Sequence, residues 1–225
     1  MPGREIVLTN NEVYHIFNRS IASQPIFLNK WDYKRAWETF FYYQNSLPPA
    51  RYSKFITQSA EIKQKILAEL QEKKIFLVEI IAFCFMPTHF HFLFKQLREN
   101  GIAKFVGNFS NSYTRYFNTK NKRNGPLLQG KFKAVHILTD EQLVHVSRYI
   151  HLNPYSSLII KKIESLIDYP FSSFPEYLGK RSESFCHKEL VLSHFKKDNA
   201  YKDFVFDQAD YQKNLQQIKH IICEP

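Results

Sequence analysis

Two adjoining apolar runs constrain the fold of this chain more than any other feature of its sequence. Residues 75–85 form an almost unbroken apolar run, and residues 89–95 (HFHFLFK) form a second one after the turn Met86-Pro87-Thr88. Runs of this length, rich in aromatic and β-branched residues and joined by a tight Pro-containing turn, are typical of paired strands. We therefore expect two adjacent central strands of a sheet.

The remaining residues show helical and strand periodicities in turn. In chain order, the expected elements are a strand at 13–18, helices at 31–47 and 57–70, the two strands above, a helix at 102–117, a loop at 118–130, a strand at 131–138 and a helix at 140–152. Thr139 and Gln142 form a capping box before the last helix, and Pro154 is expected to end it. The apolar face of the first helix includes Trp31, and that of the second includes Leu67.

The sequence beyond residue 180 is more charged and less aromatic, with two short helical patterns at 187–197 and 207–222. We therefore divide the chain into one domain at 1–180 and a helical C-terminal appendage at 181–225. A length of 225 residues, with 44% hydrophobic and 23% charged side chains, is close to the globular average and suits one ordinary domain with such an appendage.

The charge balance gives the first indication of a partner. The chain has 31 Lys and Arg residues against 21 Asp and Glu residues, a net charge of +10, which favours a nucleic acid or an anionic membrane surface. No apolar run approaches the length of about 18 residues that a membrane span requires. The three cysteines are far apart and form no metal-binding pair. We expect a cytoplasmic protein with no membrane partner.

His89 and His91 are the first candidate metal ligands. Side chains two apart on a strand point to the same face, so the two imidazoles form half of a metal site. A pair of histidines in this pattern is also often structural or incidental. The interpretation as a metal site therefore needs further ligands from elsewhere in the chain.

A polar stripe on the helix expected at 140–152 is the second candidate. His145, Tyr149 and Asn153 recur every four residues and share one face. The stripe can be explained by a half-exposed tyrosine and an asparagine that satisfies the helix end. Next to a histidine pair, however, Asn153 can supply an amide oxygen ligand, and Tyr149 is a competent covalent nucleophile.

The basic and aromatic stretch at 113–125, which continues at 130–133, is the third candidate, because cations bind phosphates and aromatic rings stack on unpaired bases. The alternative is a helix with its aromatic residues in the core, followed by a solvated basic loop. The candidate DNA-binding residues of this stretch are Arg115, Lys120, Lys122, Arg123, Lys131 and Lys133. Arg148, which precedes Tyr149 in the chain, is a further candidate.

These motifs, taken in order, resemble those of the REP-associated tyrosine transposases, which are single-tyrosine HUH enzymes. The resemblance covers roughly residues 14–177 and rests on YHIFNR at 14–19, FMPTHFH at 85–91, YTRYFN at 113–118, QGKFK at 129–133, RYIHLNP at 148–154 and YPFSS at 169–173. The chain departs from the usual family pattern at Thr88, Lys131 and Tyr155. Of these, Lys131 matters most, because lysine cannot make the bidentate phosphate contact of arginine.

The resemblance implies an α+β, ferredoxin-like fold with a central antiparallel sheet and helices packed on it. It also implies that Tyr149 is the nucleophile and that His89, His91 and Asn153 bind Mg²⁺ or Mn²⁺. The implied activity is cleavage and transfer of single-stranded DNA at hairpin-associated sites through a 5′-phosphotyrosine. The implied partner is single-stranded or hairpin DNA, and a homodimer is possible.

Two alternatives to this activity stay open. One is a non-catalytic, domesticated DNA-hairpin-binding protein of the same fold, and the other is a metal-binding enzyme of unrelated chemistry. The group that helps to remove the proton from the tyrosine is also open, with the metal, Arg148, His145 and His151 as candidates. No nucleotide-binding loop is present, which agrees with a strand transfer that needs no ATP.

Overall fold

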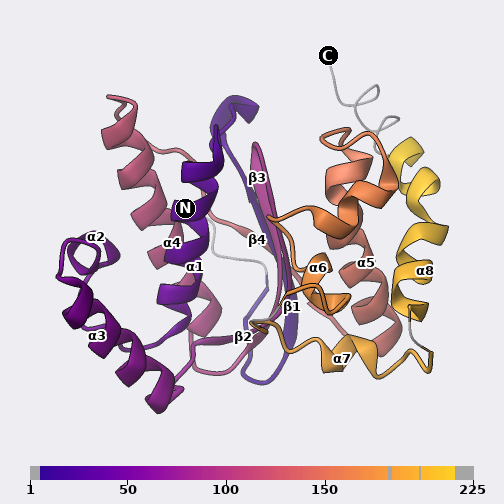
Figure 1. The fold of residues 1–225 in the computed structure, drawn as a ribbon, viewed down its shortest axis with the longest axis horizontal. Helices are drawn as coiled ribbons and strands as arrows, with labels where there is room; N and C mark the ends of the chain where they lie inside the picture. The colour runs from indigo at the N-terminus through magenta and orange to yellow at the C-terminus, as the bar shows by residue number, and fades with distance from the viewer. Residues whose placement is uncertain (1–5, 182–183, 198, 216–225) are drawn as a thin grey trace.

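A four-stranded antiparallel sheet forms the centre of the computed structural model, which describes residues 6–181, 184–197 and 199–215 (Figure 1). The strands are β1 (Val13–Arg19), β2 (Val78–Met86), β3 (His89–Gln96) and β4 (Lys133–Ile137). Their order in the sheet is β2-β3-β1-β4, and every neighbouring pair is antiparallel. With helices connecting β1 to β2 and β3 to β4, this is the topology of a ferredoxin-like α+β fold, and the predicted fold class is confirmed.

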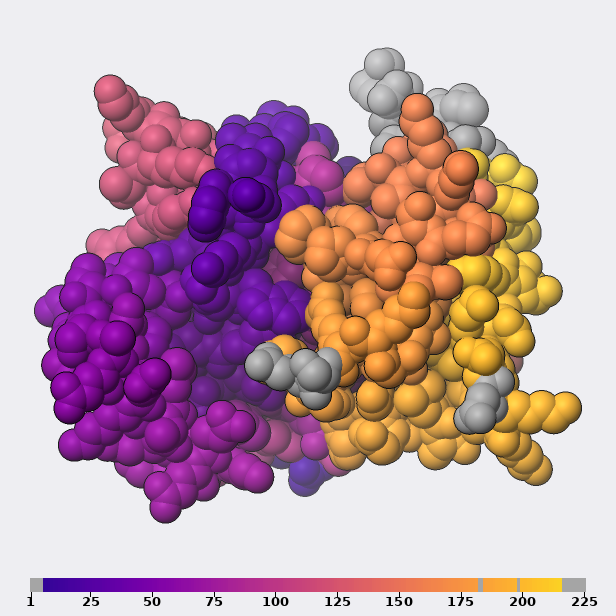
Figure 2. All heavy atoms as spheres, in the orientation of Figure 1, coloured from indigo at the N-terminus to yellow at the C-terminus, as the bar shows by residue number. Residues whose placement is uncertain are grey.

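Helices form a layer on each face of the sheet (Figure 1). The α-helices are α1 (Lys30–Gln44), α2 (Tyr52–Phe55), α3 (Ala60–Lys73), α4 (Gly101–Lys120), α5 (Asp140–Ser156), α6 (Phe174–Tyr177), α7 (Glu189–Leu192) and α8 (Ala200–Asp207), and the 3-10 helices are η1 (Ile21–Ser23) and η2 (Ile163–Asp168). α1 and α4 cover one face, whereas α5 to α8 cover the other. The space-filling view shows the same division, with the indigo and purple segments on one side and the orange and yellow C-terminal segments on the other (Figure 2).

Phenylalanine side chains fill the space between β3 and the α1–α4 layer. Phe90, Phe92 and Phe94 of β3 are fully buried there against Phe105 and Phe109 of α4. Because side chains alternate along a strand, the intervening positions of β3 face the opposite layer, which contains α5. The alternation predicted from the sequence thus determines the face on which the two histidines lie.

The outer edge of β2 is covered by the segment that carries the YPFSS motif. The backbone N–H of Phe85 donates to the carbonyl of Phe171 (2.8 Å), and that of Ser173 donates to the carbonyl of Phe83 (3.0 Å). An uncovered edge strand would present unpaired backbone groups. This motif therefore contributes to the closure of the sheet.

The end of α5 corrects one prediction. The helix continues through Pro154 to Ser156, rather than ending at Leu152. A proline inside a helix removes one backbone hydrogen bond and costs roughly 3 kcal/mol. Here the last turn is fully packed, and the side-chain amides of Asn153 and Gln212 both donate to the carbonyl of Tyr149 (2.8 and 3.1 Å). The bond that Pro154 cannot make is the one to the carbonyl of Ile150, so it is the packing of this turn that offsets the cost of the proline.

Two predicted apolar helix faces are less buried than their spacing indicates. Helix α3 forms near the expected residues, but Leu67 is 48% exposed, and among its residues only Leu70 is buried. Trp31 is 61% exposed, although it follows the Asn29 cap in the same first turn of α1 as the buried residues Asp32 and Tyr33. Helix α4 also runs three residues beyond its predicted end, so the expected loop begins after Lys120.

The C-terminal segment packs against α5 and differs in detail from the prediction. Of the helix expected at 187–197, only the short α7 forms, and α8 was not predicted. The helix expected at 207–222 is described only in part, and that part is helical at 209–215. Val191 and Val205 are fully buried, and the hydroxyl of Tyr201 lies 2.9 Å from that of Ser147 on α5. Within the described ranges, no helix has the length and apolarity needed to cross a membrane.

Candidate active site

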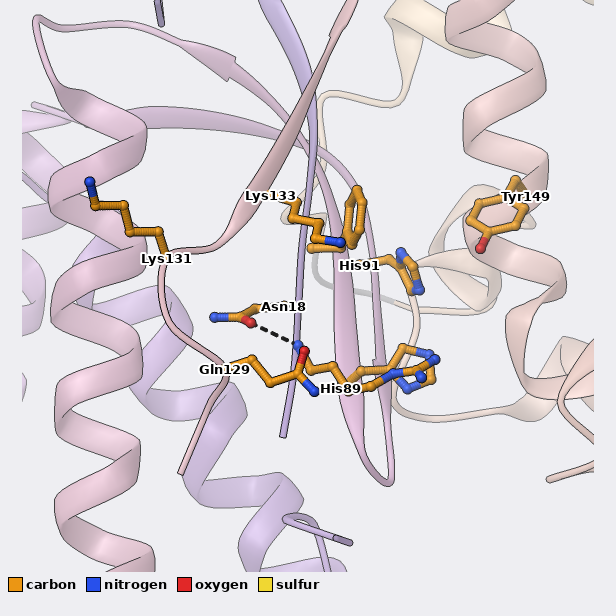
Figure 3. Close-up of a pocket in the computed structure, with 9 residues that line it drawn as sticks. Asn18, His89, His91, Gln129, Lys131, Lys133 and Tyr149 are labelled. Atoms are coloured by element: carbon orange, nitrogen blue, oxygen red, sulfur yellow. Dashed lines mark hydrogen bonds between the residues drawn. The ribbon is translucent and has the colours of Figure 1, made fainter. Parts of the chain in front are cut away.

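A cavity of about 380 Å³ opens where the C-terminal end of β1 meets the N-terminal end of β3 (Figure 3). It is lined by Phe17, Asn18, Arg19, His89, His91, Gln129, Lys131, Lys133 and Tyr149. These residues come from β1, β3, β4 with the segment before it, and α5. The cavity therefore combines residues from four distant parts of the sequence, including both predicted histidines and the predicted nucleophile.

The two histidines have matching hydrogen bonds. Their ring centroids are 5.1 Å apart, and the rings are almost perpendicular. Nδ1 of His89 lies 2.9 Å from the hydroxyl of Thr88, and Nδ1 of His91 lies 3.0 Å from Nε2 of His15. These contacts occupy one nitrogen of each ring and leave Nε2 available, which is the pattern expected of metal-binding imidazoles.

Burial keeps these imidazoles in their neutral form. It lowers the pKa of His89 to about 4, with a smaller contribution from the positive charge of Arg19. The pKa of His91 lies well below its usual range, chiefly because of burial and then because His15 and His89 are close. Only a neutral imidazole can bind a metal ion, so both side chains are ready for this role at neutral pH.

Tyr149 faces the histidine pair from α5. Its ring centroid is 5.5 Å from that of His91, at an interplanar angle of 90°. Burial raises the pKa of Tyr149 above its usual range, while Asn153 and the charge of Arg19 act in the opposite direction. The phenol is therefore protonated at neutral pH in the protein alone, and a nucleophilic role requires removal of that proton.

Asn153 is buried one turn after Tyr149 and does not line the cavity itself. Its Nδ2 group donates to the carbonyl of Tyr149, and within the described residues its Oδ1 atom has no hydrogen-bond partner. A buried carbonyl oxygen without a partner is unusual and calls for an explanation, such as an ion that the amide binds.

The chemistry of these groups suits a divalent cation, but Asn153 lies outside the cavity that the two histidines line. Two neutral imidazoles and one unpartnered amide oxygen can contribute three neutral ligands. Within the part of the chain that the structure describes, no group of three or more His, Cys, Asp or Glu side chains could hold a metal ion. A metal at this position would therefore need further oxygen ligands from water or a bound phosphate.

The predicted DNA-binding residues divide into two groups. Lys131 and Lys133 line the cavity, with Lys133 extending towards the histidines and Lys131 on the far side (Figure 3). Arg148 instead lines a second cavity of about 240 Å³ on the other side of α5, where its guanidinium lies 2.7 Å from His145 and packs over the ring of Phe204.

The remaining basic candidates lie around the end of α4. Lys120 pairs with the fully buried carboxylate of Asp32, and Arg123 donates to Asn118 and to the carbonyl of Pro126, so both stabilise the protein itself. Arg115 and Lys122 are exposed and line neither cavity.

The aromatic residues of the basic stretch serve mainly the core. Tyr113 and Phe117 are buried, and the hydroxyl of Tyr116 donates to Asp32 (2.8 Å). For these aromatic residues, the interpretation as core side chains is the better one.

Two functional candidates were absent from the predicted site. Arg19 lines the cavity, and its charge acts on Tyr149 and both histidines. His15 is 8% exposed and contacts His91. Both lie in the YHIFNR motif, where His15, Phe17 and Arg19 occupy alternate positions of one strand. Alternate positions share a face of the strand, and this was the signal in the sequence that could have found them.

The fold and the cavity define a ferredoxin-like domain with a basic pocket that brings a tyrosine next to a pair of neutral histidines. Residues 42–153 match the family model described as "Transposase IS200 like", and this segment contains both histidines, Tyr149 and Asn153. Over these residues the chain belongs to the IS200-like transposase family.

The chain is similar to a solved structure over most of its length. That structure is described as a REP-associated tyrosine transposase bound to a REP hairpin, with 16% sequence identity and a TM-score of 0.48 over 82% of this chain and 90% of that chain. A comparison with curated proteins found no match.

Proposed function

We propose that this protein is a metal-dependent endonuclease and strand transferase that acts on single-stranded DNA at hairpin-associated sites. The observation that carries the proposal is the position of Tyr149, whose ring lies next to His91 in a basic cavity large enough for a phosphodiester group. Membership of residues 42–153 in a transposase family supports the same reaction class.

The proposed step exchanges one phosphodiester bond for another. The hydroxyl oxygen of Tyr149 attacks the scissile phosphorus, a P–O bond to the tyrosine forms, and the P–O bond to the 3′ oxygen breaks. The proton lost by the tyrosine balances the proton gained by the departing 3′ oxygen. The products are a free 3′-OH and a 5′-phosphotyrosine, and reversal with another 3′-OH transfers the strand without ATP.

Residues of this chain supply the positioning and the charge. Arg19 and Lys133 line the cavity, and they would hold the scissile phosphate by its negative charge. Mg²⁺ or Mn²⁺ held by His89, His91 and Asn153 would supply Lewis-acid polarisation of that phosphate.

The structure narrows the choice of proton acceptor for Tyr149. His151 is fully buried, and its two ring nitrogens contact the hydroxyls of Tyr201 and Ser173, both at 2.7 Å. It therefore has no nitrogen available for the tyrosine. His145 remains a candidate acceptor, together with a water molecule in the main cavity. Arg148 donates to His145, and as a guanidinium it could stabilise the phenolate by its charge but could not accept the proton.

The test uses a hairpin oligonucleotide labelled at its 3′ end, because the 5′-phosphate fragment is the one that stays on the protein. With Mn²⁺ we expect an SDS-resistant adduct carrying the label, and an upstream fragment that a polymerase can extend from its 3′-OH. Tyr149→Phe should bind the hairpin and form no adduct. Tyr155→Phe, a matched change on the same helix, should leave the adduct intact.

Two outcomes would contradict this proposal. Adduct formation by Tyr149→Phe would exclude this nucleophile. Hairpin binding by the wild-type protein without any adduct or cleavage would favour the alternative of a non-catalytic hairpin-binding protein.

A further inference from the structure

His15 makes a direct side-chain contact with His91 of the histidine pair, and nothing in the proposed reaction uses it. It lies on β1, and its Nε2 atom is 3.0 Å from Nδ1 of His91. The two rings are stacked with centroids 5.2 Å apart, and the ring of His15 also meets Tyr149 edge-on at 5.9 Å. The imidazole is nearly inaccessible to solvent, so the contact is sheltered from competing water.

The backbone determines this contact. In the β1–β3 ladder Phe17 is directly opposite His91, and His15 is opposite Leu93. His15 and His91 are thus diagonal neighbours on one face of the sheet, a distance that long side chains can reach. Movement of the imidazole of His15 away from His91 would require a change in the packing of the strand pair.

The tautomers of imidazole then decide which of the two rings donates the hydrogen bond between His15 and His91. His91 can bind a metal through Nε2 only if its ring proton is on Nδ1. In that tautomer Nδ1–H is the donor, so Nε2 of His15 must be the acceptor, and the proton of the neutral His15 ring must be on its own Nδ1.

We propose that His15 is a positioning residue that holds His91 in its Nδ1–H tautomer and orients its Nε2 atom towards a divalent metal. This inference rests on the metal site of the proposed function. Thr88 is the corresponding partner of His89, through its hydroxyl group.

Two substitutions separate the hydrogen bond from the packing. His15→Phe keeps a planar ring and removes the acceptor, whereas His15→Gln places a side-chain amide oxygen near the position of Nε2. The matched control is His136→Phe on β4, because His136 stacks on Tyr14 and pairs with Glu12 outside the cavity.

The measurements are the Mn²⁺ dissociation constant by calorimetry and the tautomer of His91 by ¹⁵N NMR of the metal-free protein. We expect the wild-type ring of His91 to be in the Nδ1–H form. In His15→Phe we expect mixed tautomers and a Mn²⁺ affinity lower by about 10-fold to 100-fold. His15→Gln should restore both properties in large part, and the control should match the wild type.

A wild-type His91 with its proton on Nε2 would overturn the inference without any variant, as would an unchanged Mn²⁺ affinity in folded His15→Phe. Neither measurement depends on DNA cleavage. If the protein does not cleave DNA, the Mn²⁺ affinity and the tautomer of His91 therefore still test the role of His15.

A second and independent observation concerns Trp31 in the first turn of α1. This ring is 61% exposed, and the ammonium groups of Lys30 and Lys34 lie 5.3 and 6.0 Å from its centroid. Trp37, the other tryptophan of the chain, instead packs against Phe41 and other aromatic rings. An exposed tryptophan flanked by two cations is an uncommon surface feature.

Trp31 is at the same end of the sheet as the cavity. The backbone N–H groups of Ile26 and Phe27 both donate to the carbonyl of Pro87, in the turn that leads into His89. The start of α1 therefore lies beside the β2–β3 turn, on the face of the sheet opposite to the histidines. A strand bound in the cavity would have to pass around this end of the sheet to reach Trp31.

We infer that Trp31 is a stacking platform for an unpaired base of the bound single strand, with Lys30 and Lys34 neutralising adjacent phosphates. This inference rests on single-stranded DNA as the proposed ligand. Aromatic rings stack on any base, and nearby cations add a salt-dependent attraction, so the recognition would be independent of sequence.

The test uses Trp37→Phe as the background, which leaves Trp31 as the only tryptophan. Titration with oligo-dT should quench its fluorescence, and Trp31→Ala should weaken binding of a hairpin with an unpaired tail by roughly fivefold or more, with little effect on blunt duplex. Trp31→Phe should restore most of the affinity. Leu67→Ala, another exposed apolar residue far along the chain on α3, is the control.

Unchanged fluorescence with saturating oligo-dT would overturn this inference, and so would equal weakening for tailed hairpin and blunt duplex. A protein that binds oligo-dT with quenching but never cleaves would refute the nuclease and leave the stacking platform in place.

Discussion

Acidification should destabilise this protein through His151, an imidazole that plays no part in the candidate active site. His151 is fully buried between the hydroxyls of Tyr201 and Ser173, and burial lowers its pKa from 6.5 to about 3. The unfolded chain takes up a proton near the ordinary pKa, whereas the folded protein does so only near pH 3. Between these two values the unfolded state binds more protons, so stability falls as the pH falls.

The size of the effect follows from this difference in proton binding. Each pH unit below the unfolded pKa removes about 1.4 kcal/mol, so a change from about pH 7 to about pH 5 should remove about 2 kcal/mol through His151. Other buried imidazoles, such as His15 and His89, act in the same direction. A substitution is therefore needed to isolate the contribution of His151.

The assay is urea unfolding, followed by far-UV circular dichroism, of the wild type and of His151→Gln at both pH values. Glutamine is neutral at either pH, and its amide has a donor and an acceptor for the two hydroxyls. The variant can be less stable at both pH values, but the wild type should lose about 2 kcal/mol more than the variant on acidification. Equal losses in the two proteins would refute the reasoning.

Three further outcomes follow from the contacts described. Lys131→Gln with Lys133→Gln should lower the slope of log affinity against log salt by about 1.4 for single-stranded DNA, measured by fluorescence anisotropy, because two phosphate contacts are lost. Asp32→Asn should lower the free energy of unfolding by about 1–3 kcal/mol, because the buried carboxylate loses its charge-assisted bonds to Tyr116 and Lys120. The loss is no larger because the side chain of Lys120 can still turn to solvent. Asn153→Ala should raise the Mn²⁺ concentration needed for half-maximal cleavage and cost about 1 kcal/mol of stability, because both amide functions disappear.

Each of these outcomes has a control or a contradicting result. The exposed pair Lys65 and Lys73 on α3, changed to glutamine, should leave the salt slope unchanged. An Asp32→Asn protein as stable as the wild type would mean that the buried carboxylate contributes nothing. A Mn²⁺ requirement unaffected by Asn153→Ala would remove that amide from the proposed ligands.

The sequence was most informative where a local pattern determines the structure. The alternation of phenylalanines and histidines in HFHFLFK is enough to place Phe92 and His91 on opposite faces of a strand, whatever surrounds them. The capping box of Thr139 likewise marks the start of α5, where its hydroxyl accepts from the backbone N–H of Gln142 (3.2 Å). Both features depend only on residues a few positions apart.

Predictions went wrong, or stayed incomplete, where the deciding partner is far away in the chain. Pro154 does not end α5, because Gln212 and close packing support the last turn. Lys120 was among the candidate DNA-binding residues, and only the fold shows that its ammonium group pairs with Asp32. The contact of His15 with His91 depends on the register of β1 against β3, and one sequence alone does not reveal that register.

Tyr149 lines both the cavity that contains the histidine pair and the second cavity that contains Arg148. Replacement by alanine would leave a ring-sized vacancy with solvent-filled space on either side and with the histidine pair still in place. Vacancies of this kind in proteins can take up free aromatic molecules of matching size. A soluble phenol could therefore occupy the place of the Tyr149 ring, and it would bring a different acidity to the position of the proposed nucleophile.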